Sequence, residues 1–141
     1  MRIAVCSQAE ALHLAEEVTE KTAIISITSK GDENVAFPKN PNILAVLHLK
    51  FNDLIVEYDE EGLPYGRELP QQEDFVGLKE FVTGLSCEQL IVHCWEGVSR
   101  SAAVAKAVYE FLGGNKDILS SPQGLSPNPL VYKLVCRELK G

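Results

Sequence analysis

The sequence predicts an α/β protein with a central, mainly parallel sheet of four or five strands and helices on both faces. Short apolar runs typical of buried strands alternate along the chain with longer segments whose apolar residues recur at helical spacing. Strands separated by helices pair in parallel through right-handed crossovers, which place helices against the sheet. The chain has 141 residues and no low-complexity tract or internal linker, so we expect a single domain (1–141).

The first half of the chain carries three expected strands and one helix. Residues 2–6 and 22–28 are short apolar runs, and the second is rich in isoleucine and threonine. Between them, Ser7 and Glu10 match a capping box at the start of a helix. Residues 43–49 are almost continuously apolar, which is typical of a strand covered on both faces.

The second half of the chain carries one expected strand, at 90–93, and three helices. Residues 71–85 place their apolar side chains on one helical face. Residues 99–111 are apolar nearly all round and end at two glycines, so we expect a buried helix. Asn128 is a favourable N-cap for the last helix, which has proline at its first position. Ligands of parallel sheets bind at the carboxyl ends of the strands, and the strand at 90–93 leads to the most informative segment.

That segment is residues 93–101, with the sequence His-Cys-Trp-Glu-Gly-Val-Ser-Arg-Ser. In a strand-loop-helix unit, the backbone N–H groups of the loop and the positive end of the helix can converge on one anion. Arg100 offers a planar fork for two phosphoryl oxygens. The same groups stabilise a thiolate, and at helix N-termini they lower the cysteine pKa from roughly 8.5 to about 3.5–7.5. The segment therefore predicts a phosphate-binding loop with Cys94 as its nucleophile. The loop residues whose N–H groups we expect to contact phosphate are Trp95, Glu96, Gly97, Val98 and Ser99.

The pattern His93-Cys94-x5-Arg100-Ser101, with Gly97 in place, resembles the His-Cys-x-x-Gly-x-x-Arg-Ser/Thr signature of the cysteine-dependent protein phosphatases. The likeness is to the compact dual-specificity type and to similar small tyrosine-phosphatase-like proteins. It implies a protein-tyrosine-phosphatase-like fold and an enzyme that hydrolyses phosphomonoesters through a phosphocysteine intermediate. Phosphotyrosine in proteins is the leading substrate, with phosphoserine and phosphothreonine as further candidates. Because Arg100 and the loop N–H groups supply the charge stabilisation, we expect no metal or other cofactor.

Attack by Cys94 on phosphorus leaves an alkoxide or phenolate that needs a proton, so this chemistry calls for a general acid. Asp53 follows the third expected strand, and the resemblance implies the general acid at that place. The alternative for Asp53 is an exposed loop residue without a catalytic role. Asp59 and Asp74 are fallback acids, although Asp59 is better explained by an acidic loop and Asp74 by a helix start.

The resemblance implies supporting roles for three further residues. Ser101 matches the hydroxyl that assists the cysteine as leaving group when water cleaves the phosphoenzyme. His93 matches a residue that tunes the thiolate through hydrogen bonds within the loop. Asn128 matches an asparagine that braces the loop, and capping of the last helix alone is an equally weighted alternative. Trp95 fits either a wall for an aromatic leaving group or a packing role.

Composition narrows the class of partner. The net charge of −7 argues against nucleic-acid binding, and no apolar run approaches the ~20 residues that span a bilayer. We therefore expect a cytoplasmic protein that acts on a phosphoprotein or phosphopeptide, with a monomer as the default and the oligomeric state left open. Residues 51–66 contain no lysine or arginine and five acidic residues, which indicates a solvated loop or an acidic rim that favours basic phosphopeptides.

Other functions remain open at this stage. One is a phosphate-binding interaction module that has lost turnover, and another is a phosphatase acting on a non-protein phosphoester. Cys6, Cys87 and Cys136 are widely spaced, which argues against a zinc site or a disulfide framework. We expect them to be small buried hydrophobic residues or bystanders, with a protective disulfide to Cys94 as the alternative.

Overall fold

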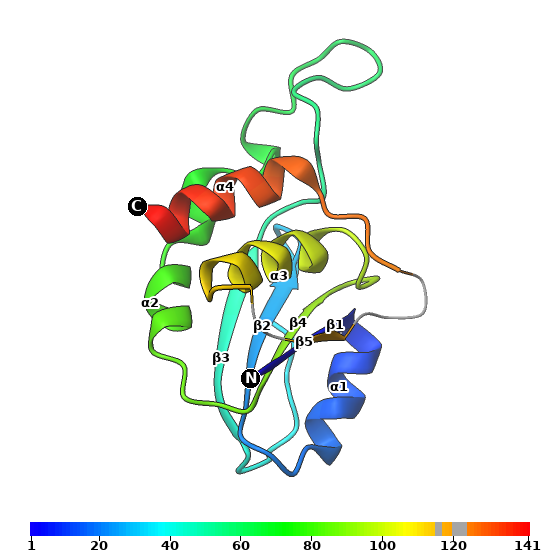
Figure 1. The fold of residues 1–141 in the computed structure, drawn as a ribbon. Coiled ribbons are helices and arrows are strands. Elements are labelled where there is room, and N and C mark those ends of the chain that lie inside the picture. Colours follow the sequence, from blue (N-terminus) through cyan, green and yellow to red (C-terminus); the bar gives the residue numbers. More distant parts are fainter. Residues whose placement is uncertain (115–116, 120–123) are drawn as a thin grey trace.

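The computed structural model describes residues 1–114, 117–119 and 124–141. Within these residues, five parallel strands form one sheet in the order β3-β2-β4-β1-β5 (Figure 1). The predicted α/β class with a parallel sheet is therefore confirmed. The strands are β1 (Arg2–Ser7), β2 (Thr22–Thr28), β3 (Ile43–Lys50), β4 (Gln89–Cys94) and β5 (Asp117–Leu119).

Helices cover both faces of the sheet, as predicted. On one face, α1 packs with two alanines against β1, β2 and β4. On the other face, α2, α3 and α4 enclose the larger apolar core, and α3 is buried along most of its length. None of the helices that the structure describes is long and apolar enough to cross a lipid bilayer. The helices are α1 (Gln8–Glu17), α2 (Leu78–Thr83), α3 (Arg100–Phe111) and α4 (Pro129–Lys140), with 3₁₀ helices η1 (Gly66–Glu68) and η2 (Gln72–Phe75).

The apolar side chains of the central strands divide between two cores, one on each face of the sheet. Val5 and Ile25 both pair with Val92, and all three belong to the larger core. Side chains alternate between the faces of a strand, so Ile91, one residue earlier, packs on the α1 side. The predicted capping box is also present: Ser7 Oγ accepts from the Glu10 N–H, and the Glu10 carboxylate accepts from the Ser7 N–H, both at 3.1 Å.

Two predictions about regular structure are wrong. Residues 71–85 do not form one helix, because Gly77 has a φ of 93° and separates η2 from α2. That conformation favours glycine and cannot continue a right-handed helix. β3 is not covered on both faces either: it is an edge strand in the described sheet, and Leu44 is 52% exposed. The short strand β5 has no counterpart among the sequence-based expectations.

Candidate active site

Cys94 is the last residue of β4 and Arg100 is the first of α3, so the residues between them form a loop at the carboxyl edge of the sheet. The Cys94 sulfur lies 3.3 Å from the Gly97 nitrogen and 3.2 Å from the Ser101 hydroxyl oxygen. Burial disfavours the thiolate, but the hydrogen bonds from Ser101 and Gly97 and the Arg100 charge outweigh it. The pKa of Cys94 is therefore lowered from its ordinary value. This environment favours the nucleophilic form of the sulfur.

Gly97 brings the loop against the end of β1. Its φ is 78°, and a Cβ atom at this position would lie 2.3–2.7 Å from backbone atoms of Cys6 and Ser7. No side chain fits at that separation, so only glycine allows this approach. The loop is also attached to α1, because the Gln8 N–H donates to the Trp95 carbonyl at 3.2 Å. The Gly97 N–H is thereby held where it donates to the Cys94 sulfur.

The Arg100 guanidinium is held in place by two hydrogen bonds. The side chain is buried, and its Nη1 donates to the Ser29 hydroxyl and to the Phe51 carbonyl, each at 3.0 Å. Ser29 follows β2 and Phe51 follows β3, so the guanidinium is held by the carboxyl ends of two strands. These two partners were not foreseen, because nothing local in the sequence marks them.

Asp53 lies beside the loop in a defined orientation. Its Oδ1 accepts from the Ser99 hydroxyl at 2.9 Å and from the Asn128 side-chain amide at 2.8 Å. Two donors on one carboxylate oxygen fix the direction of the side chain. Asp53 is an exposed loop residue, as the alternative has it, and these two hydrogen bonds hold its side chain.

Asn128 makes contacts at both of the places that the sequence left open, the start of α4 and the segment around Asp53. Its side-chain oxygen caps α4 by accepting from two backbone N–H groups in the first turn. Its amide nitrogen donates to Asp53 and to the Leu54 carbonyl, the latter at 3.1 Å. Its backbone N–H donates to the Ser99 carbonyl at 3.2 Å. Asn128 thus joins Ser99, at the start of α3, to the segment that carries Asp53.

His93 supports the loop from the opposite side of β4. Its Nδ1 lies 3.1 Å from the Cys94 carbonyl oxygen and its Nε2 lies 2.7 Å from the Ser26 hydroxyl. A carbonyl only accepts, so Nδ1 carries the proton and Nε2 of the neutral ring accepts from Ser26. Burial lowers the pKa of His93, which favours this neutral ring. His93 orients the Cys94 backbone and does not reach the cavity.

Six of the predicted residues line one cavity of about 190 Å³. The predicted residues that do not line it are His93, Gly97, Val98, Ser101 and Asn128. Trp95 stands at its rim with 66% of its surface exposed. An adjoining hollow of about 210 Å³ shares Trp95 and Arg100 with this cavity. A larger hollow of about 470 Å³ lies at the amino ends of the strands, near Met1 and Lys21, and none of the predicted site residues lines it. The lining residues of the site cavity are Asp53, Cys94, Trp95, Glu96, Ser99 and Arg100.

The fallback acids lie outside the site cavity. Asp59 accepts from the N–H groups of Glu61 and Leu63 in a tight turn, and Asp74 accepts from the Gln71 N–H at the start of η2. Both are explained by these local bonds, and of the three candidate acids Asp53 alone lines the cavity with Cys94.

The other cysteines are not bonded to Cys94. All four cysteines of the chain are free thiols, so the protective disulfide is not formed in this structure. Cys6 is buried, and burial together with nearby Glu10 raises its pKa to about 12. Cys87 and Cys136 are only partly buried, so the expectation of small buried hydrophobic residues holds best for Cys6.

No protein-family model matches the chain, and no curated protein sequence matches it.

Proposed function

We propose that this protein is a cysteine-dependent phosphatase of the compact dual-specificity, tyrosine-phosphatase-like type. Its substrate would be a phosphomonoester, with phosphotyrosine in proteins as the leading class. The observation that carries the proposal is the position of the Cys94 sulfur. It accepts hydrogen bonds from Gly97 and Ser101 at the floor of a cavity that Asp53 and Arg100 also line. A merely structural cysteine has no need of such partners.

In the first step, the Cys94 thiolate attacks phosphorus. The sulfur–phosphorus bond forms as the phosphorus–oxygen ester bond breaks, and Asp53 gives its proton to the leaving oxygen. Arg100 and the loop N–H groups stabilise the charge on the three other phosphoryl oxygens. Because the Arg100 side chain is already bound by Ser29 and Phe51, little reorganisation is needed during the reaction.

In the second step, water attacks phosphorus and the sulfur–phosphorus bond breaks. Asp53, now ionised, accepts a proton from the water, and the phosphate leaves. Ser101 donates to the departing sulfur from 3.2 Å, which stabilises the returning thiolate. Ser99 and Asn128 hold Asp53 in one direction through both steps.

Burst kinetics test this two-step scheme. Replacing Ser101 by alanine removes a hydrogen bond to the leaving sulfur, so it should slow the second step more than the first. Rapid mixing of this variant with p-nitrophenyl phosphate should release about one nitrophenolate per protein molecule before a slower steady phase. A binding module without turnover would release none. Steady release without a fast phase in the Ser101→Ala variant would argue against a phosphocysteine intermediate.

Replacing Asp53 by asparagine should lower kcat/KM much more for an ester with a poor leaving group than for one with a good leaving group. Asparagine keeps the shape but has no proton to give, so kcat/KM for phenyl phosphate should fall by about 10²–10⁴-fold. Nitrophenolate leaves without protonation, so p-nitrophenyl phosphate should lose less than about 10-fold. The ratio of the two values, measured on one enzyme preparation, is the decisive quantity. Equal losses for the two esters would remove Asp53 as the general acid.

A further inference from the structure

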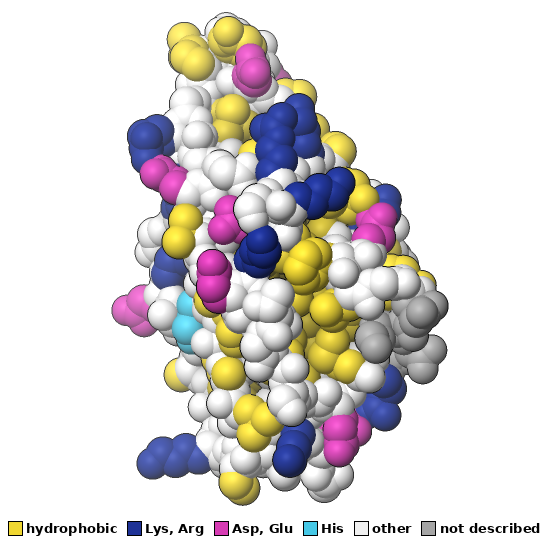
Figure 2. Space-filling model, turned by 60° about the vertical axis from the view of Figure 1, so that its left-hand side comes forward, with side chains coloured by type: hydrophobic (Ala, Val, Ile, Leu, Met, Phe, Trp, Pro, Cys, Tyr) yellow, Lys and Arg dark blue, Asp and Glu magenta, His cyan; other side chains and the backbone are white. Residues whose placement is uncertain are grey.

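A projecting hairpin follows Asp53 directly. Residues 54–65 leave the body of the protein as the long loop at the top of Figure 1. Four of its large apolar side chains are more than half exposed, with exposed fractions of 54–60%. Figure 2 shows apolar and acidic side chains together at this projecting end. So much exposed apolar surface on a short segment indicates an interaction surface. The four residues are Ile55, Val56, Tyr58 and Leu63.

The hairpin has a defined backbone. Tyr58 and Pro64 form an antiparallel bridge, and the Tyr65 N–H donates to the Glu57 carbonyl at 3.0 Å. At the tip, the Asp59 carboxylate accepts from the N–H groups of Glu61 and Leu63, each at 2.9 Å. The apolar residues are therefore presented on an ordered support, and less ordering entropy is lost when a partner binds.

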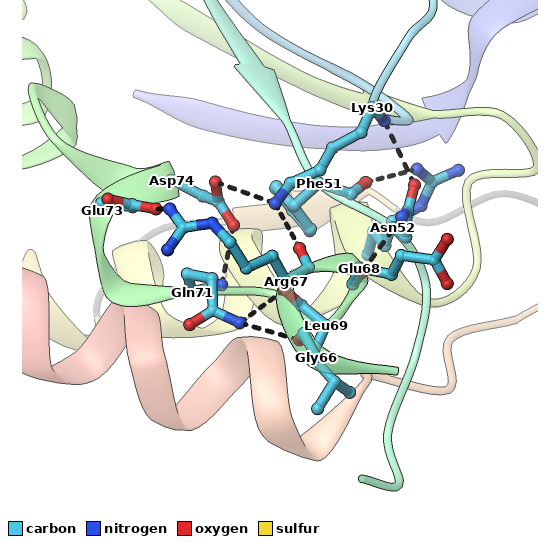
Figure 3. A network of polar contacts seen from close by, with 11 residues as sticks. Lys30, Phe51, Asn52, Gly66, Arg67, Glu68, Leu69, Gln71, Glu73 and Asp74 are labelled. Atoms are coloured by element: carbon cyan, nitrogen blue, oxygen red, sulfur yellow. Dashed lines mark hydrogen bonds and ion pairs between the residues drawn. The ribbon is translucent and has the colours of Figure 1, made fainter. Parts of the chain in front are cut away.

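The base of the hairpin is fixed relative to the site (Figure 3). The Asn52 side-chain oxygen accepts from the backbone N–H of Lys30 at 3.1 Å, and its amide nitrogen donates to the Glu68 carbonyl at 3.0 Å. The Lys30 ammonium donates to the Arg67 carbonyl at 2.6 Å and lies 3.8 Å from Asp74. These contacts hold both ends of the hairpin, and its first end follows Asp53, which lines the cavity.

The negative charge of the hairpin indicates which kind of partner binds this surface. Residues 51–66 contain no lysine or arginine, whereas the hairpin carries Glu57, Asp59, Glu60 and Glu61. A second copy of the chain would bring the same acidic hairpin and a net charge of −7, so it would be repelled. An anionic lipid surface would be repelled for the same reason. A polypeptide with lysine or arginine next to apolar side chains complements both features.

We infer that the hairpin of residues 54–65 is a docking arm for protein substrates, and that it selects a segment with basic and apolar side chains close to the phosphorylated residue. This inference rests on the proposed phosphatase function and names the substrate class of that site. The arm acts on binding and not on the chemical step, because none of its exposed apolar residues lines the cavity.

Two phosphotyrosine peptides test the charge preference, one flanked by lysine and leucine and one by glutamate and leucine. The parent protein should show a kcat/KM about 10-fold or more higher for the basic peptide, through KM. Replacing Glu60 and Glu61 by glutamine should lower that ratio by about 3–10-fold. The matched control replaces Glu16 and Glu17 of α1, another adjacent exposed pair, and should leave the ratio unchanged.

A second pair of variants tests the apolar surface. Val56→Ser should raise KM for the basic peptide by about 3–10-fold, because it removes one exposed apolar contact. Val76→Ser is the control, since Val76 is also highly exposed, at 71%, but lies between η2 and α2. All variants should turn over p-nitrophenyl phosphate within about 2-fold of the parent, because this small ester does not reach the hairpin.

Failure of the proposed phosphatase function and failure of the docking arm would give different results. Absence of p-nitrophenyl phosphate turnover in the parent protein would overturn the proposed function itself. Normal turnover with equal kcat/KM for the two peptides would overturn the docking arm alone. A dimer in sedimentation that Val56→Ser dissociates would assign the apolar surface to a second copy and would also overturn the inference.

Discussion

Replacement of Cys94 by serine should reduce turnover of p-nitrophenyl phosphate by about 10⁴-fold or more. Serine fits the site and can keep the hydrogen bonds to Gly97 and Ser101. Its hydroxyl, however, stays protonated at neutral pH under conditions that favour the Cys94 thiolate. Steady-state assays at neutral pH, with the variant freshly purified from contaminating phosphatases, measure the loss.

The same variant should still bind phosphate, because Arg100 and the loop N–H groups are unchanged. Protection against thermal unfolding by millimolar phosphate measures this binding. Cys87→Ser makes the same substitution at a partly buried cysteine near Met1, outside the cavity, and should keep the parental rate. A Cys94→Ser variant that hydrolyses the ester as fast as the parent would show that another group is the nucleophile.

The local features of the fold were accessible from the sequence because each depends on a few neighbouring residues. The capping box at Ser7 and Glu10 and the Asn128 cap are spacings of two or three residues. The break at Gly77 was missed because the apolar spacing of residues 71–85 continues across it. Periodicity records which side chains are buried, and it does not record the positive φ of one glycine.

The candidate site also combines contacts that depend on neighbouring residues with contacts that depend on the whole fold. Cys94, Gly97 and Ser101 lie within eight residues, so their spacing alone predicts their meeting. The contact between Asp53 and Asn128 joins residues 75 positions apart, and it exists because β3 ends near the place where α4 begins. Ser26 and Ser29, which support His93 and Arg100, are ordinary serines in the sequence and acquire their roles through β2.

Replacement of Gly97 by alanine should damage stability and activity together. The added Cβ would lie 2.3–2.7 Å from the Cys6 and Ser7 backbone, and the φ of 78° is itself unfavourable for alanine. The end of β1 and the loop must therefore move apart. We expect the free energy of unfolding to fall by about 3 kcal/mol or more. The folded variant should lose about 10²-fold or more in kcat, because the N–H of residue 97 no longer lies where it donates to the Cys94 sulfur.

Gly62→Ala is the matched control for that experiment. Gly62 has nearly the same φ, 82°, but no atom lies within 4 Å of its added Cβ. This variant carries the conformational cost alone, about 1 kcal/mol, and should keep its turnover of p-nitrophenyl phosphate. Urea denaturation gives the free energy of unfolding of both variants, and initial rates give the activity. Equal losses at the two positions would mean that the close approach of Gly97 to β1 does not support the loop, since backbone strain alone would then account for both.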